Sequence, residues 1–173
     1  MENHIKKKKA RGVTIIELIM VIVIVGLITA VSGMYIKETV DLWRFLSFRN
    51  ELVNEGRMAL MKMAREIRQI KNHSSITVAN SSQITFTDIN NHVISYQLSN
   101  GNLVRTYDGV ANTLADRVTA LTFIYYNSAN AVLTPLPLDS SSRANIYRLD
   151  VSFSMRAGSQ TKILNTQVYP RNL

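Results

Sequence analysis

An apolar stretch of membrane length, residues 13–36, constrains this chain more than any other feature. About 20 mostly apolar residues suffice to cross the hydrocarbon core of a bilayer as a helix. The many valines and isoleucines in the stretch would suit a buried strand in water. In lipid, however, the backbone has to satisfy its own hydrogen bonds, so the stretch predicts a transmembrane helix. Its six positions that are not apolar are Thr14, Glu17, Gly26, Thr29, Ser32 and Gly33.

Basic residues cluster immediately before this stretch. The positive-inside rule retains such residues in the cytoplasm, so we expect the preceding segment to be cytoplasmic and the remainder of the chain to lie on the other side of the membrane. The residues that carry this topology signal are Lys6, Lys7, Lys8, Lys9 and Arg11.

Glu17 is the one carboxylate in the apolar stretch. A carboxylate at the centre of a membrane helix costs about 2.5–3.5 kcal/mol on insertion scales, and less near the start of the helix. Two interpretations remain open. Glu17 either sits at the membrane interface, favoured by the positive end of the helix dipole, or it meets a positive group of another subunit.

Residues 11–19, Arg-Gly-Val-Thr-Ile-Ile-Glu-Leu-Ile, resemble the cleavage and methylation signature of type IV prepilins and type II secretion pseudopilins. The resemblance implies that an aspartyl prepilin peptidase cuts after Gly12 and N-methylates Val13. It also implies that Glu17 neutralises the terminal amine of a neighbouring subunit. The family usually has Phe where this chain has Val13. Many major pilins also have a helix-kinking proline, and residues 29–36 contain none.

An ordinary secretory signal is the main alternative for this segment. Residues 18–29 have the length of a signal-peptide core, and Ala30, Val31 and Ser32 fit a small-x-small cleavage site, which would place the mature start at Gly33. Against this alternative, Glu17 interrupts the start of the run, and apolar helical patterning continues beyond the supposed cleavage site.

The net charge of +8 raises the question of nucleic-acid binding. Residues 1–12 contribute +4, which belongs to the topology signal, and the other +4 is scattered along the chain. Basic residues of the predicted helix are interleaved with Glu55 and Glu66, a pattern typical of a solvated face. A DNA-binding, competence-type pilus subunit is thus an alternative, with nucleic acid disfavoured as a partner. Cysteine is absent, so no disulfide stabilises the chain.

Residues 37–72 predict an amphipathic continuation of the helix, because they contain no proline and one glycine, and their apolar residues recur at steps of three, four and seven. A weak point or bend is expected near residues 50–56, where Ser47, Asn50 and Gly56 dilute the apolar stripe. The predicted stripe comprises Ile36, Val40, Trp43, Leu46, Val53, Leu60, Met63, Ile67 and Ile70.

Residues 73–173 alternate with period two and predict antiparallel strands. Asn100 and Gly101 predict a hairpin turn. The clearest strand has Tyr147, Leu149, Val151, Phe153 and Met155 on its buried face, with Arg148 and Asp150 among the residues expected in water. Residues 135–143 read as a loop, and a last strand is expected near residues 162–169.

Together these segments predict an α+β fold, in which one long helix packs on one antiparallel sheet. The predicted organisation is a cleaved leader (1–12), a transmembrane and filament-core helix (13–36), an amphipathic helix (37–72) and an extracytoplasmic β-rich domain (73–173). After the helix, residues 61–68, 101–105 and 170–173 most resemble minor pilins and J-type minor pseudopilins.

No catalytic or metal site is predicted. His4, His73 and His92 lack metal-type spacing, and no phosphate loop or nucleophile elbow is present. Some pseudopilins bind calcium through loop carboxylates. Asp139 would be the candidate here, although a solvated turn is favoured. Trp43 is expected to anchor at an interface or to pack against another subunit.

The sequence therefore predicts a minor pilin or pseudopilin that is not an enzyme and that needs no cofactor or small-molecule substrate. The partners that the resemblance implies are prepilin peptidase, the bacterial inner membrane, and other pilin or pseudopilin subunits contacted through the N-terminal helix. The expected location is that membrane and then a pilus or pseudopilus. The choice between the two machines stays open, as does a tip or shaft position.

Overall fold

The computed structural model describes residues 12–157 and 160–173, and the chain divides into two units, Met1–Leu46 and Ser47–Leu173. A long helix followed by antiparallel sheets confirms the predicted α+β class. The elements are α1 (Ile15–Ile67), the 3-10 turn η1 (His73–Ser75), β1 (Ile76–Ala79), β2 (Gln83–Thr87), β3 (Val93–Ser99), β4 (Asn102–Tyr107), β5 (Val110–Ala115), β6 (Val118–Tyr126), α2 (Ser140–Arg143), β7 (Arg148–Ala157) and β8 (Gln160–Val168).

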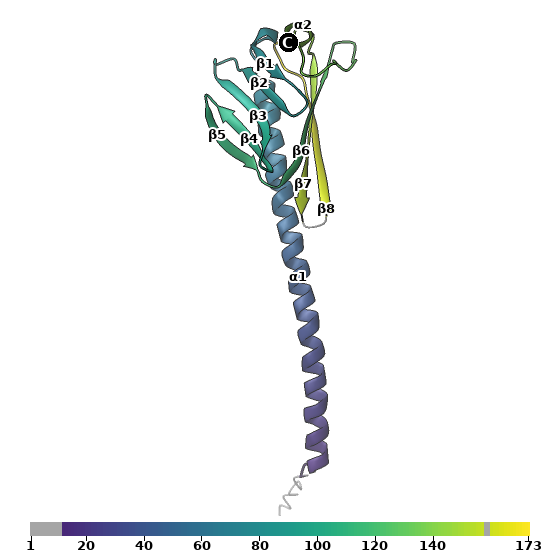
Figure 1. The fold of residues 1–173 in the computed structure, drawn as a ribbon. Helices are drawn as coiled ribbons and strands as arrows, with labels where there is room; N and C mark the ends of the chain where they lie inside the picture. Colours follow the sequence, from purple (N-terminus) through teal and green to yellow (C-terminus); the bar gives the residue numbers. More distant parts are fainter. Residues whose placement is uncertain (1–11, 158–159) are drawn as a thin grey trace, which may run out of the picture. The chain divides into compact units, whose positions relative to one another are not determined.

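The strands form two sheets, so the expectation of one sheet was wrong (Figure 1). One sheet has the order β1-β2-β3-β4-β5, and the other has the order β6-β7-β8. The chain changes direction after β5 at Arg117, whose φ is 57°, and Glu55 of α1 accepts a hydrogen bond from the Asp116 N–H at 2.8 Å. Strand β6 then pairs with β7 while packing against β2, β3 and β4.

Tight turns connect the strands of the first sheet. Asn100 and Gly101 both have positive φ, 50° and 76°, which is the signature of a type I′ hairpin, and they join the paired strands β3 and β4 as predicted. Asp108 and Gly109 repeat this geometry between β4 and β5, with φ of 47° and 86°. In the turn before β3, the Asp88 carboxylate accepts hydrogen bonds from two backbone N–H groups.

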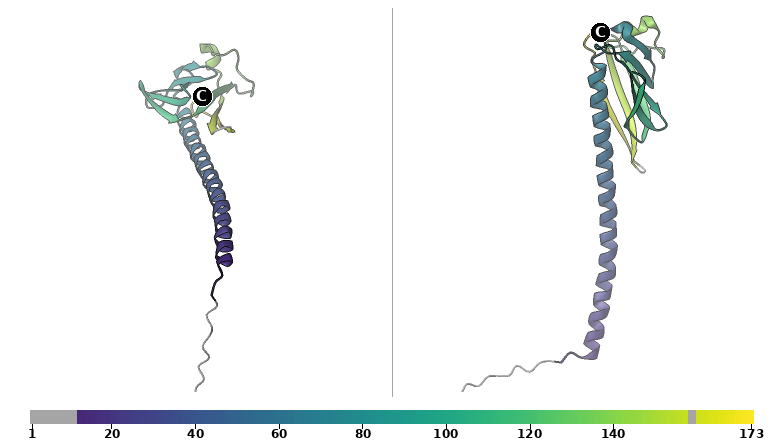
Figure 2. Two further views of the ribbon diagram at one scale, coloured as in Figure 1. Left: turned by 60° about the horizontal axis from the view of Figure 1, so that its bottom comes forward. Right: turned by 90° about the vertical axis from the view of Figure 1, so that its left-hand side faces the viewer.

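One hydrophobic core lies between the two sheets and residues 52–67 of α1. Figure 2 shows both sheets on the same side of this part of the helix. The first sheet contributes fully buried side chains such as Phe86 and Tyr96, and the second contributes Phe123, Tyr125 and Phe153. Burial of these large side chains is the main favourable term that holds the second unit together.

The buried face of α1 differs in part from the predicted stripe. Leu60, Met63 and Ile67 are buried as expected. Val53 is only half-buried, and Leu52, Gly56 and Ala59 lie on the buried face instead. The expected weak point at 50–56 is helical throughout. Of the other predicted positions, Ile70 is buried just beyond the helix, whereas Ile36, Val40, Trp43 and Leu46 are 64%, 42%, 73% and 43% exposed.

Helix α1 ends at Ile67, earlier than the predicted end at Lys71 or Asn72. The last turn tightens because the Gln69 and Ile70 N–H groups bond three residues back. Ile70 then forms a bridge with Asp88, and the Lys71 N–H donates to the Thr87 carbonyl. Pairing with the sheet thus competes with the final helical turn and replaces it.

The predicted alternation of β7 holds for four of its five inward positions, since Leu149, Val151, Phe153 and Met155 are buried. Tyr147 is 48% exposed because it precedes the strand. Arg148, expected in water, is buried, and its guanidinium lies 3.8 Å from the centre of the Tyr126 ring. A cation–π contact with the neighbouring strand therefore covers a charge that alternation alone would expose.

Glu66 is buried, which corrects its assignment to a solvated face. Its Oε2 accepts hydrogen bonds from the Tyr96 hydroxyl on β3 and from Arg105 Nε on β4, the latter at 2.8 Å. Burial, together with the bond to Glu66, raises the pKa of Tyr96, so this hydroxyl remains a proton donor. The three side chains connect α1 to the first sheet through a charge whose partners all come from within the chain.

Replacing Glu66 by Ala should lower the free energy of unfolding by about 2–4 kcal/mol, because it leaves Arg105 without its counter-ion and Tyr96 without its acceptor. Glu66→Gln should cost less, since an amide oxygen still accepts a hydrogen bond from Tyr96. Denaturant unfolding of the mature chain in detergent micelles measures both. The control is Glu51→Ala at an exposed position of the same helix, expected within about 0.5 kcal/mol of the parent. Equal stability of Glu66→Ala and the control would contradict this role.

Gly56 permits close approach between α1 and the second sheet. A Cβ atom added at this position would lie 2.4 Å from Leu164 Cδ1 and 2.6 Å from Met155 Sδ. Both contacts are far shorter than van der Waals separation, so a side chain at position 56 must displace its neighbours. The glycine therefore serves packing.

Gly56→Val should lower the free energy of unfolding by about 1–3 kcal/mol through overpacking. The double variant Gly56→Val/Leu164→Ala should lose less free energy of unfolding than the two single variants added together. The smaller side chain at position 164 makes room for the valine at position 56, and the two positions are in contact. Met61→Val, at an exposed position of the same helix, controls for the effect of valine on helix propensity. Gly56→Val as stable as Met61→Val would show that the close approach is not needed.

Candidate processing and assembly site

The predicted processing site lies just before α1, whose first turn is capped by the Thr14 side chain. Gly12, Val13 and Thr14 are exposed and precede α1. Thr14 Oγ1 accepts a hydrogen bond from the Glu17 N–H at 3.4 Å, and the Thr14 carbonyl accepts one from the Leu18 N–H at 3.1 Å. Thr14 is therefore the N-cap and Ile15 the first helical residue. The Gly12–Val13 peptide bond lies outside the helix.

Glu17 occupies the third helical position, where a carboxylate is favoured by the helix dipole. The threonine-x-x-glutamate spacing is a capping-box signal that sequence reasoning missed. Within the described residues no ion pair involves Glu17. The next basic residue along α1 is Lys37, about 30 Å away at 1.5 Å per residue. A cation that pairs with Glu17 would thus not come from the described part of α1.

The first part of α1 is apolar all round and uncovered. Ile15, Leu18 and Leu27 are 80%, 54% and 63% exposed, and every other residue from 15 to 36 is exposed as well. By length and composition, α1 contains one segment able to cross a membrane, which fits anchoring in the inner membrane. The Thr29 hydroxyl donates to the Val25 carbonyl at 2.7 Å, so this polar group is satisfied within the helix.

The predicted topology residues Lys6, Lys7, Lys8, Lys9 and Arg11 lie outside the described residues. Gly12, Val13 and Glu17 are brought together by sequence proximity alone, within and just before the first turn of α1. Trp43, expected at an interface, is 73% exposed. The assignment of roles to these residues stays a prediction.

Asp139, the candidate calcium ligand, caps the short helix α2, a helical turn within the predicted loop 135–143. Its carboxylate accepts hydrogen bonds from the Ser142 N–H at 2.7 Å and the Ser141 hydroxyl at 2.9 Å. The bond from the Ser142 backbone is the main cause that lowers the pKa of Asp139. In residues 12–157 and 160–173, no cluster of three potential metal ligands occurs.

Each histidine in the described part of the chain contacts a residue of another loop or turn. His92 Nδ1 lies 2.7 Å from Asp108 Oδ2, and this contact joins the turns at the ends of β2 and β4. His73 Nε2 lies 3.2 Å from the Ile146 carbonyl. These contacts give the two side chains a role in connecting loops.

Residues 7–33 match the family model of the prokaryotic N-terminal methylation motif. No curated protein matches the chain. The motif, the long apolar helix and the α+β layout support a type IV prepilin-like family. The chain is thus indicated as a type IV pilin-like or pseudopilin-like precursor, and the proteins of this family are structural rather than catalytic.

Proposed function

We propose that this chain is a minor pilin or pseudopilin of a type IV pilus or type II secretion system, assembled through its N-terminal helix. Prepilin peptidase removes residues 1–12 and N-methylates Val13, and the helix then moves from the membrane into the filament core. The supporting observation is an uncovered apolar stretch of α1, residues 15–36, whose single carboxylate, Glu17, has no ion-pair partner within the described residues.

The local geometry supports cleavage between Gly12 and Val13. Both residues are exposed and precede the helix, so a peptidase can take them up in an extended conformation without unwinding α1. Glycine before the cut removes side-chain hindrance at this position. The Thr14 cap keeps the helix intact immediately after the cut.

Glu17 pairs, in this proposal, with the methylated amine of Val13 of a neighbouring subunit. A carboxylate among apolar helices is strongly unfavourable alone, whereas a nearby cation at low dielectric stabilises it. The ion pair would then fix the axial position of one subunit relative to its neighbour, because subunits docked at another height would leave both charges unpaired.

The mature protein purified from its native host should begin with N-methylated Val13, as read by intact mass and N-terminal peptide sequencing. Gly12→Val should accumulate as the full-length precursor, because a side chain at this position obstructs the peptidase. A mature start at Gly33 would identify an ordinary secretory signal, and an intact Met1 would leave a membrane-anchored protein that is not processed. Either result would overturn the proposed pathway.

Glu17→Ala should leave membrane insertion and processing intact but lower the amount of the subunit in sheared filaments by at least about tenfold, since its neighbour's amine loses a partner in an apolar environment. Immunoblots of filament and membrane fractions give the ratio, and the mass of the mature chain verifies processing. Glu38→Ala, an exposed carboxylate further along α1, is the matched control. Normal incorporation of Glu17→Ala would reject the ion pair.

A further inference from the structure

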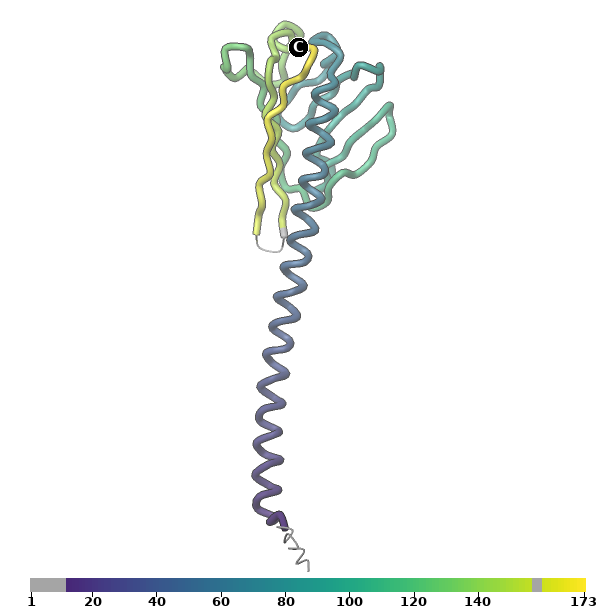
Figure 3. Tube along the Cα trace, turned by 180° about the vertical axis from the view of Figure 1, so that it is seen from behind, coloured from purple at the N-terminus to yellow at the C-terminus, as the bar shows by residue number. Residues whose placement is uncertain are grey.

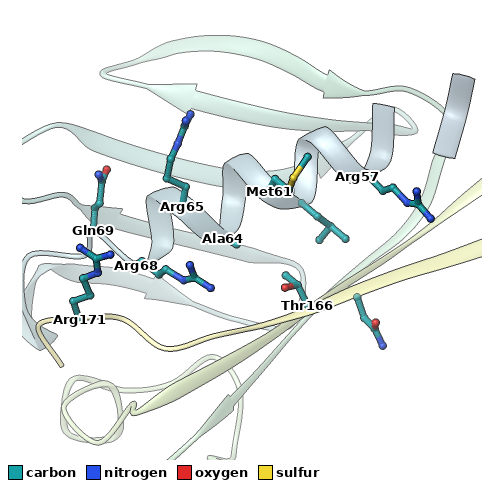
Figure 4. Close-up of a pocket in the computed structure, with 10 residues that line it drawn as sticks. Arg57, Met61, Ala64, Arg65, Arg68, Gln69, Thr166 and Arg171 are labelled. Carbon is teal, nitrogen blue, oxygen red and sulfur yellow. The ribbon is translucent and has the colours of Figure 1, made fainter. Parts of the chain in front are cut away.

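A groove of about 510 Å³ lies in the second unit, between the last turns of α1 and strand β8 (Figure 4). Figure 3 shows β8 running beside this part of the helix. Arg171 and Gln69 lie at one end of the groove, and Arg57 lies toward the other. The arginines that line it are Arg57, Arg65, Arg68 and Arg171.

The positive charge of the groove is uncompensated within the described residues. All four arginines are exposed, and none of them belongs to an ion pair there. Glu66, on the same stretch of α1, is already bonded to Arg105 and Tyr96. The Arg171 backbone N–H donates a hydrogen bond to the Arg68 carbonyl at 3.2 Å, which places these two residues next to each other. The groove therefore presents four exposed guanidinium groups that have no counter-ion within the described residues, which suits an anionic partner.

The groove also reaches the open edge of a sheet. Strand β8 is the last strand of the β6-β7-β8 sheet, and within the described residues its backbone pairs only with β7. Both Asn165 and Thr166 line the groove. Because neighbouring residues of a strand point to opposite faces, a surface lined by both lies along the edge of the strand. Such an edge offers backbone donors and acceptors to an added strand.

The helix side of the groove also carries apolar residues. Leu60, Met61 and Ala64 line it between the arginines, and Met61 is 64% exposed. A phosphate backbone gains little from such a surface, whereas a peptide strand can place apolar side chains on it and acidic side chains on the arginines. The combination of an apolar wall, an open strand edge and arginines favours a peptide over a nucleic acid.

We propose that this groove binds an extended acidic segment of a different protein, which adds to the edge of β8 as a further strand. A second copy of this chain would not supply that segment, because Asp150 is the single acidic residue in its described strands, and it is partly buried. The proposal goes beyond filament assembly, since it concerns the second unit and does not depend on Glu17 or on processing.

The test uses the mature chain in detergent micelles and a fluorescent eight-residue peptide in which glutamate alternates with valine, with fluorescence anisotropy as the readout. Arg68→Glu/Arg171→Glu should weaken binding by at least about tenfold at low salt, because two attractions become repulsions. Arg44→Glu, an exposed arginine elsewhere on α1, should change binding less than about twofold. Circular dichroism of each variant verifies that the exposed substitutions leave the fold intact.

A second arm separates strand addition from simple charge attraction. The same peptide with alternate backbone nitrogens methylated keeps its charge but loses the donors that a strand needs, so it should bind at least about tenfold more weakly. Equal binding of the methylated peptide, or equal loss with Arg44→Glu, would overturn the proposal. Preferential binding of a DNA duplex, reduced by Arg68→Glu/Arg171→Glu and steeply dependent on salt, would overturn it in favour of nucleic acid.

Discussion

The structure depends on one constraint: an apolar helical surface, residues 15–36, that no other described residue covers. From Ile15 to Ile36 the large side chains are more than half exposed. Burying one such side chain is worth about 1.5–3 kcal/mol, so the segment as a whole strongly favours lipid or other apolar helices over water. The N-terminal methylation motif matches residues 7–33 and so overlaps the start of this segment, and Gly12, Val13 and Thr14 precede the helix.

Two carboxylates of α1 show how one helix serves two environments. Glu66 lies in the second unit and finds its hydroxyl and guanidinium partners on β3 and β4. Glu17 lies in the apolar segment. Within the described residues its carboxylate has no ion-pair partner, and it is favoured only by the dipole at the start of the helix. A charge that is neutralised within the chain contributes to the fold. A charge that lacks such a partner is a candidate for contacts between molecules.

Local signals were read correctly where neighbouring residues decide the outcome. Asn100 and Gly101 form the predicted turn because both adopt positive φ, and the inward positions of β7 follow from period-two alternation. Strand β5 was not among the predicted strands, because it is mostly exposed and its residues do not alternate between apolar and polar. The Asp108-Gly109 pair before it is nevertheless a hairpin-turn signal. The Thr14 cap was likewise visible in the threonine-x-x-glutamate spacing.

The sequence alone determined the membrane-length helix, the N-terminal methylation motif at residues 7–33, and the α+β class, since these depend on composition, spacing and periodicity. Only the tertiary structure decided that there are two sheets, that Glu66 and Arg148 are buried, and that Gly56 is a packing residue. It also brought Arg171 beside Arg68 at the edge of β8. These features arise from contacts between segments far apart in the chain, and the pattern of residues within a single segment does not specify them.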